Sequence, residues 1–279
     1  TILSNLISSQ VEIHAQYGGV VPEIAARSHI DVIIPVIEKA LSEAKTDWAS
    51  IDAIAVTKGP GLLGSLLIGV MTAKTLAITK QKPLIGVNHI WAHGFAAYLT
   101  DNKPEFPFLA LTVSGGHTTL ALCKADLTRE TLGETLDDAA GEAFDKVARL
   151  LGLLQGQSYH GGPAIAKAAE SGNANAYTLP VAKLGKDSLD FSFSGLKTAV
   201  LRLVQEITGT NPAALKSRKT YDLDEQVVAD IAASFQKAVV TALVQNTLKA
   251  HARYQPKSIV VGGGVACNKS LREEMHKVL

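Results

Sequence analysis

Two histidines four residues apart, His89 and His93, are candidates for metal chemistry in this 279-residue sequence. On a helix, residues at positions i and i+4 lie one turn apart on the same face, so both imidazoles can reach one metal ion. Zinc proteases use this spacing with a glutamate after the first histidine as general base, but Ile90 stands there. The pair predicts a metal site without peptidase chemistry. Two histidines that only contact backbone or core groups would show the same spacing.

Two glycine-rich segments could bring backbone close to a nucleotide. Residues 114–117 (Ser-Gly-Gly-His) join two apolar segments, and their amides could form an anion nest or an ordinary hairpin. Residues 262–264 (Gly-Gly-Gly) separate an apolar segment from a predicted helix that begins near Asn268. A purine or phosphate could lie against bare backbone there, although a tight strand–helix turn explains the glycines equally well.

Residues 137–146 (DDAAGEAFDK) are acidic where a helix is predicted to begin. The helix dipole and capping explain the first carboxylates, but Asp145 lies deeper, where a buried carboxylate could bind ribose hydroxyls or a metal-bound water. Residues 160–163 (His-Gly-Gly-Pro) offer a second glycine approach point, or simply a helix start. Residues 190–197 (DFSFSGLK) suit a phosphate or RNA contact, or a capped helix.

Two further features are weaker candidates. Residues 216–219 (Lys-Ser-Arg-Lys) form a short basic run, which is usually a solvated loop. Cys267 precedes a predicted helix, where a thiolate is favoured, but no histidine adjacent in the sequence could act as its base. We therefore assign no catalytic side chain.

Alternating apolar segments and helical periodicities predict an α/β protein that positions these residues. The proline-containing stretch 101–107 predicts a lobe boundary, with an N-terminal lobe at 1–107 and a C-terminal lobe at 108–279. Predicted strands cover 1–9, 51–56, 84–87, 108–113, 118–123, 131–136 and 259–261. Predicted helices cover 22–41, 62–79, 89–99, 139–151, 163–171, 195–207, 225–254 and 268–279.

Composition excludes several classes of protein. Lys and Arg number 27 against 26 Asp and Glu, so the net charge of +1 argues against a strongly basic nucleic-acid clamp. Aromatic residues make up only 5% of the chain, which disfavours a base-stacking platform. No segment is predicted to span a membrane, and two cysteines favour a reducing cytoplasm. Without an initiator Met, and with residue 279 inside a predicted helix, we expect the sequence to be truncated at both ends.

Taken together, the motifs resemble the tRNA N6-adenosine threonylcarbamoyltransferase family, also called TsaD or Gcp and earlier O-sialoglycoprotein endopeptidase. The resemblance covers essentially the whole chain and is greatest for the bacterial branch. The segments that carry it, in order, are 17–23 (YGGVVPE), 59–61 (GPG), His89 with His93, 113–117 (VSGGH), 137–146, 190–197 and 262–265 (GGGV).

The resemblance implies the two-lobed nucleotide-binding fold of actin, hexokinase and heat-shock chaperones. It also implies a metal on His89 and His93, Fe²⁺ first and Zn²⁺ second. An adenine nucleotide, either ATP, ADP or threonylcarbamoyl-AMP, would be the ligand. Its phosphate side would meet Thr112, Val113, Ser114, Gly115 and Gly116, its ribose region Asp145 and Gly162, and Asn268 would contact it near the 262–264 turn.

The implied activity is that of an N6-L-threonylcarbamoyladenine synthase, an acyltransferase. It would move the threonylcarbamoyl group from threonylcarbamoyl-AMP to the adenosine beside the anticodon in tRNAs that read ANN codons. A metal and backbone amides near the leaving phosphate would stabilise developing charge, and positioning would activate the weakly nucleophilic amine. The implied partners are tRNA and proteins of the TsaB, TsaE and TsaC types. The alternative is a kinase or an ATP-dependent regulatory protein of the same fold, which would not need the histidine pair.

The sequence departs from the family pattern at several points. The first strand and first nucleotide loop are expected before Thr1, and a third metal ligand, an Asp, beyond Leu279. Ala166 stands where some relatives have an acidic residue, and residues 156–159 resemble a small insertion.

Overall fold

A computed structural model describes residues 1–154, 160–209 and 223–279. Its contacts divide the chain into two compact units, Thr1–Ala92 and His93–Leu279. The division falls inside helix α4 (His89–Phe95). The lobe boundary between residues 107 and 108 stays a prediction, and the second sheet begins at this point with Phe108.

Unit 1 is a βαβ arrangement, and a second long helix packs against its connecting helix. Strands β1 (Ile54–Gly59) and β2 (Leu84–Asn88) are parallel, and α3 (Leu63–Thr79) connects them. Parallel neighbours need such a crossover, because a short turn can only reverse the chain. Helix α2 (Pro22–Glu43) packs on α3 and begins with a proline, which needs no amide partner there. A short helix, α1 (Val11–Ala15), precedes it.

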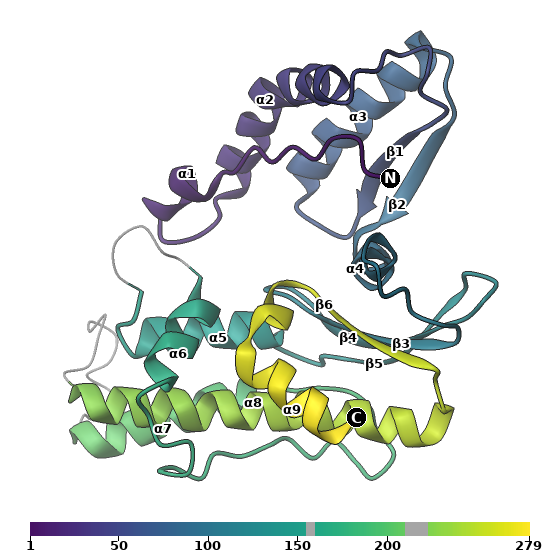
Figure 1. The fold of residues 1–279 in the computed structure, drawn as a ribbon. Helices are drawn as coiled ribbons and strands as arrows, with labels where there is room; N and C mark the ends of the chain where they lie inside the picture. Colours follow the sequence, from purple (N-terminus) through teal and green to yellow (C-terminus); the bar gives the residue numbers. More distant parts are fainter. Residues whose placement is uncertain (155–159, 210–222) are drawn as a thin grey trace. The chain divides into compact units, whose positions relative to one another are not determined.

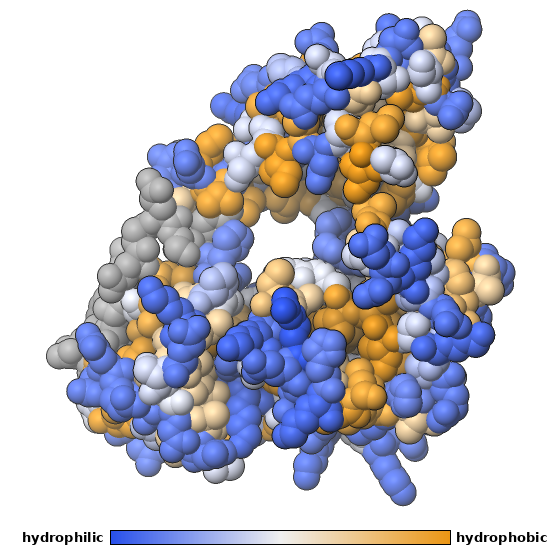
Figure 2. All heavy atoms as spheres, in the orientation of Figure 1, coloured by the Kyte–Doolittle hydropathy of each residue, from blue (hydrophilic) through white to orange (hydrophobic). Residues whose placement is uncertain are grey.

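The strand predicted for residues 1–9 is not formed. Its apolar residues Ile2, Leu3 and Ile7 are exposed, and the only strands that pair in unit 1 among the described residues are β1 and β2. A strand exists only when another backbone accepts its hydrogen bonds, so apolar composition alone did not suffice. Helix α3 also exposes Leu63 and Met71, and Figure 2 shows apolar surface on this unit.

Unit 2 contains a four-stranded sheet in the order β5-β4-β3-β6. Its strands are β3 (Phe108–Val113), β4 (Thr118–Cys123), β5 (Arg129–Glu134) and β6 (Ser258–Gly262). Strand β3 is antiparallel to β4 and parallel to β6, with Thr112 opposite Gly262. Because β3 and β6 end at the same edge, the turns that follow them are neighbours in space. We call these the Ser114 turn (residues 114–117) and the Gly263 turn (residues 262–264).

Helices cover one face of this sheet and form the main core (Figure 1). They are α5 (Ala140–Leu150), α6 (Gly161–Ala169), α7 (Ser194–Thr208), α8 (Glu225–Tyr254) and α9 (Lys269–Val278), with the 3₁₀ helix η3 (Gly264–Cys267) between β6 and α9. In the described part of the chain, α8 is the one helix long and apolar enough to cross a membrane. Most of that stretch is buried inside unit 2, as expected for a core helix.

The opposite face packs against a smaller aromatic cluster. Phe95 and Tyr98 lie on Phe108, whose ring also contacts Phe106. Tyr98 belongs to the 3₁₀ helix η1 (Ala96–Leu99), which ends the helix predicted for residues 89–99 in a tighter form. Gly94 allows α4 to lie close to β3, because a Cβ built on Gly94 would lie 3.1 Å from the Cβ of Ala110.

Element types agree with the sequence predictions from residue 22 onward, whereas several boundaries move. The strand predicted at 51–56 is Ile54–Gly59, because its partner β2 sets the register and begins only at Leu84. The strand predicted at 131–136 is Arg129–Glu134, where Arg129 pairs with Cys123. The helix predicted from residue 163 begins at Gly161. For the two strands, the paired strand shifted the boundary by two or three residues.

Gly263 is required for the fold of its turn. Its φ of +92° and ψ of 169° are nearly restricted to glycine, and an added Cβ would lie 2.3 Å from the carbonyl oxygen of Val113. We expect Gly263→Ala to lower the unfolding free energy by at least about 1–3 kcal/mol in urea titrations. The matched control is Gly264→Ala, since a Cβ on Gly264 meets no atom within 4 Å. Equal stability of the two variants would contradict this role.

Candidate functional site

A pocket of about 570 Å³ lies in unit 2, where the Ser114 turn and the segment after the Gly263 turn meet the first turns of α5 and α6. We call it the glycine-edged pocket. Its walls are mostly apolar side chains and glycine backbone, with few polar groups, which is the usual composition of a small-molecule site. The residues that line it are Gly115, Gly141, Phe144, Asp145, His160, Gly162, Pro163, Ala166, Gly264, Val265, Cys267, Asn268 and Lys269.

Three lining glycines leave backbone open to the pocket. A Cβ built on Gly115, Gly162 or Gly264 meets no atom within 4 Å. Gly263 and Gly262 differ, since a Cβ on either would approach the carbonyl of Val113 or His93. The sequence left open whether the glycines of this turn face a ligand or form a tight strand–helix turn, and two of them, Gly262 and Gly263, serve close packing. Only Gly264 of the three lines the pocket.

Asp145 is the carboxylate of the pocket. Its Oδ1 accepts the Gly161 N–H at 2.6 Å, which ties α5 to the first residue of α6. Burial raises the pKa of the Asp145 carboxyl above its ordinary value, and the Gly161 amide and the nearby His160 and Arg149 oppose this effect. A carboxylate accepts several hydrogen bonds, so Asp145 can also accept one from a ligand hydroxyl.

The predicted phosphate loop, Thr112 to Gly116, is only partly at the pocket. Thr112 and Val113 are strand residues with buried side chains, and the Thr112 hydroxyl is buried with no hydrogen-bond partner in the described part of the chain. Ser114 closes the turn: its N–H donates to the His117 carbonyl at 2.8 Å, and its Oγ accepts the His117 N–H at 3.1 Å. Gly115 is the member of this loop that lines the pocket.

Asn268 is held by two bonds within the protein. Its Oδ1 accepts the Leu271 N–H at 3.0 Å and so caps α9, while its Nδ2 donates to Gln236 Oε1 at 2.7 Å. Asn268 is thus the N-cap of the helix that the sequence predicted to begin near it. Asn268, Gly115, Asp145 and Gly162 come from four separate parts of the sequence and line one pocket. Whether they bind a nucleotide stays a prediction.

The predicted metal ligands lie on α4, which contains both His89 and His93 and so places them one turn apart. Each histidine also has a contact of its own within the protein. Across residues 1–154, 160–209 and 223–279, no three His, Cys, Asp or Glu side chains are grouped to hold a metal ion. Whether the pair binds a metal stays a prediction: two imidazoles would supply two nitrogen ligands of a transition metal, and water, substrate or other groups would complete the coordination.

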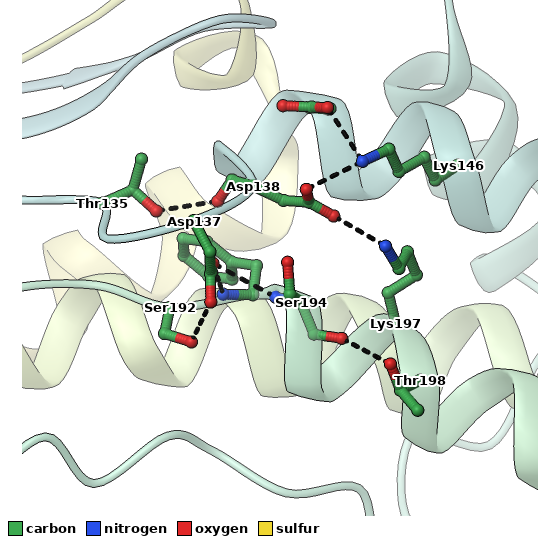
Figure 3. Close-up of polar contacts among 10 residues, drawn as sticks. Thr135, Asp137, Asp138, Lys146, Ser192, Ser194, Lys197 and Thr198 are labelled. Carbon is green, nitrogen blue, oxygen red and sulfur yellow. Dashed lines mark hydrogen bonds and ion pairs between the residues drawn. The ribbon is translucent and has the colours of Figure 1, made fainter.

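A polar network lies beside α5, where the segments 134–138 and 190–198 meet (Figure 3). Asp137, which is distant in the sequence, caps the start of α7. Its Oδ1 accepts the N–H groups of Phe193 and Ser194 at 2.8 and 3.2 Å, and its Oδ2 accepts a hydrogen bond from the Ser192 hydroxyl. This end of α7 is therefore capped, but by Asp137 and not by a serine of the 190–197 segment, and whether that segment contacts phosphate or RNA stays a prediction. The serines contact Asp137 in the structure.

Asp138 lies between two lysines (Figure 3). Its Oδ1 accepts from Lys146 Nζ at 2.7 Å and its Oδ2 from Lys197 Nζ at 3.1 Å, while Lys146 also contacts Glu142 at 2.8 Å. Burial raises the pKa of the Asp138 carboxyl, but the bonds from Lys146 and Lys197 outweigh burial and hold it below its ordinary value. Asp138 is therefore ionised at neutral pH.

The sequence did not predict Phe144, Val265 or Lys269 as site residues. Phe144 and Val265 lie within the named segments 137–146 and 262–265, whereas Lys269 lies in none, and only the structure shows that all three line the pocket. Cys267, which the sequence disfavoured as a nucleophile, is an exposed free cysteine that also lines the pocket. The basic run 216–219 and the insertion 156–159 lie outside the described residues.

Comparison with known proteins concerns the whole chain. All residues, 1–279, match the family model described as TsaD, tRNA N6-adenosine threonylcarbamoyltransferase. The chain is 50% identical over 278 residues to the tRNA N6-adenosine threonylcarbamoyltransferase of Symbiobacterium thermophilum, covering all of this chain and 76% of that protein. It is 48% identical over 283 residues to that of Trichodesmium erythraeum, covering all of this chain and 84% of that protein.

Solved structures confirm the predicted fold class. HypF of T. kodakarensis is similar with a TM-score of 0.59 at 15% identity, over 88% of this chain and 39% of that protein. This likeness concerns the fold alone. Together with the two α/β units, it supports the predicted fold of the actin, hexokinase and heat-shock-chaperone type.

The raised pKa of Asp145 predicts a pH dependence of stability. Just above 3.8, the ordinary value, the folded protein keeps a proton on this carboxyl that the unfolded chain has lost. The window runs from pH 3.8 up to the raised pKa of Asp145 in the folded protein. As the pH rises through this window, the unfolding free energy of the wild type should fall relative to that of Asp145→Asn, and above the window the difference should stay constant. Urea titrations of both proteins from about pH 3 to about pH 7 measure this difference. A difference that grows in favour of the wild type over the window would contradict it.

Proposed function

This chain belongs to the tRNA N6-adenosine threonylcarbamoyltransferase family, and we propose that its glycine-edged pocket holds the adenylate part of the donor. The chain is an enzyme that transfers a threonylcarbamoyl group to N6 of adenosine in tRNA. The donor is threonylcarbamoyl-AMP, and the acceptor is the adenosine beside the anticodon in tRNAs that read ANN codons. The observation that carries the proposal is the convergence of Gly115, Asp145 and Gly162 on one pocket.

The pocket offers distinct contacts to the parts of an adenylate. Asp145 accepts a ribose hydroxyl in addition to the Gly161 amide, since a carboxylate has lone pairs for both. Gly115 and Gly264 let backbone lie close to the phosphate or purine, because no side chain fills the space. Phe144 and Val265 supply apolar wall. Ligand pockets commonly combine apolar walls with a few polar groups that orient the ligand, and this pocket has the same composition.

The reaction needs positioning more than a strong base. The N6 amine attacks the carbamoyl carbon, the bond from that carbon to the phosphate oxygen breaks, AMP leaves with the electron pair, and the amine loses a proton. The exocyclic amine is a weak nucleophile, so holding it against the donor supplies much of the acceleration. Backbone amides near the phosphate stabilise the charge that develops there. No side chain of this chain is assigned as the general base.

His89 and His93 are the residues that would hold a metal, with Fe²⁺ preferred and Zn²⁺ second. Their one-turn spacing on α4 supports this role. Such an ion, when bound, supplies Lewis-acid stabilisation of negative charge. ATP or ADP is the second ligand class that the same fold would accept.

The substrate tRNA and partner proteins complete the proposed system. We place the enzyme in the cytoplasm with partners of the TsaB, TsaE and TsaC types, following the family resemblance. A net charge of +1 supports the need for partners, because tight tRNA binding requires many phosphate contacts. The two free cysteines, Cys123 and Cys267, agree with a reducing compartment.

The pocket is tested by a methyl group placed inside it. Gly162→Ala should lower threonylcarbamoyl transfer to unmodified tRNA by about tenfold or more, because the methyl occupies ligand space. The assay contains the partners, threonine, bicarbonate and ATP, and nucleoside mass spectrometry measures the product. Gly195→Ala is the matched control: Gly195 is also the second residue of a helix with open space at Cβ, but it is not a lining residue of the pocket. Equal activity of both variants would remove the nucleotide from this pocket.

The metal is tested by elemental analysis of protein purified without chelators. His89→Ala and His93→Ala should each reduce metal content to background while circular dichroism stays unchanged. His276→Ala, a histidine on α9, is the control and should retain metal. A wild type that carries no metal above background, or variants that retain it, would show that the pair is not a metal site.

A further inference from the structure

The connection between β5 and α5 carries the polar network of Figure 3, and its charge has no part in the proposed chemistry. We propose that Asp138 is a positioning residue for the glycine-edged pocket: with Lys146 and Lys197, it fixes where α5 begins against the Ser114 turn. The inference rests on the proposed function, because it assumes that this pocket binds the adenylate. It concerns a residue outside the pocket lining.

The first amides of α5 are bonded to the Ser114 turn and its flanking strand. Ala140 N–H donates to the Thr118 hydroxyl at 2.9 Å, and Gly141 N–H donates to the Ser114 carbonyl at 3.2 Å. A Cβ on Gly141 would lie 2.5 Å from that carbonyl oxygen. The helix therefore starts in direct contact with the turn, and a small movement of α5 would break these bonds.

Helix α5 presents the pocket residues from the same first turns. Phe144 and Asp145 line the pocket, and Asp145 also takes the Gly161 amide at the start of α6. The α5–α6 contact is as close as the contact with the turn, since a Cβ on Gly161 would lie 2.5 Å from the Asp145 Cα. The position of α5 thus sets the distances among three sides of the pocket: the Ser114 turn, Asp145 and the Gly162 backbone.

Asp138 holds the first turn of α5 in place. It lies just before α5, and Ala139, the residue at the N-cap position, makes no side-chain cap bond. The Asp138 side chain is 14% exposed, and its carboxylate bonds Lys146 on α5 and Lys197 on α7. The backbone carbonyl of Asp138 accepts the Thr135 hydroxyl at 2.7 Å. These bonds connect the helix start to α7 and to the end of β5. Charge-assisted bonds to two cations give a fixed geometry that a neutral amide cannot reproduce.

The test replaces the carboxylate with an amide of the same size. In Asp138→Asn, Lys146 and Lys197 stay hydrated, because each is one-third exposed, so the protein is expected to fold. Calorimetry with ADP should show a dissociation constant raised about tenfold or more. Hydrogen exchange at Ala140 and Gly141 should be about tenfold faster than in the wild type, with α8 unchanged.

Two further variants sharpen the result. Lys197→Met should weaken ADP binding in the same direction, whereas Lys197→Arg keeps the charge and should restore it. If Asp138→Asn does not fold, this pair carries the test. Asp187→Asn is the matched control, because Asp187 forms an exposed ion pair with Arg253 at 3.9 Å and should leave ADP affinity unchanged.

The outcomes separate this inference from the proposed function. If Asp138→Asn binds ADP as tightly as the wild type, the positioning role is overturned, even if the melting temperature falls. Where Asp138→Asn does not fold, the same result in Lys197→Met overturns it. Unchanged exchange at Ala140 and Gly141 in the tested variant also overturns it. If the wild type does not bind ADP, or if Gly162→Ala binds ADP as well as the wild type, the pocket assignment itself fails and this inference fails with it.

Discussion

The parallel pairing of β3 with β6 is the constraint on which the rest of unit 2 depends. It joins strands that are far apart in the sequence and sets Thr112 opposite Gly262, so the Ser114 and Gly263 turns leave the sheet at the same edge. Parallel strands need long connections, and here the connection contains α5 to α8, which form the core. The glycine-edged pocket follows from this pairing, since its lining includes Gly115, just after β3, and Gly264, just after β6.

Close backbone approach is the second requirement of the site. Gly263 lies against the Val113 carbonyl, Gly141 against the Ser114 carbonyl and Gly161 against Asp145. These glycines allow packing, whereas Gly115, Gly162 and Gly264 leave space open. The two roles cannot be told apart in a sequence motif such as Gly-Gly-Gly, but they predict opposite results for alanine substitution. Packing glycines affect stability, and open ones affect binding.

The carboxylates of Asp137 and Asp138 bond other parts of the protein. Asp137 caps α7, and Asp138 joins α5 to α7 through two lysines. Ion pairs that are only partly buried, such as these, give modest net stability, but they fix geometry. This physical balance is the reason to expect a change in affinity, more than in stability, when the Asp138 charge is removed. Asp145 differs, since burial raises its pKa and its lining position faces the pocket.

The sequence by itself determined the α/β class, the type of nearly every element after residue 22, and the family, because periodicity and ordered motifs are local properties. It also predicted Asp145, Gly162 and Asn268 as nucleotide-binding residues, and all three line one pocket. Tertiary structure alone decided the rest: residues 1–9 form no strand without a paired backbone, Gly263 serves packing, and Phe144 and Lys269 join the pocket. It also decided that the serines of the 190–197 segment bond Asp137. These features depend on which distant atoms come within a few ångströms, and the spacing of residues along one chain does not contain that information.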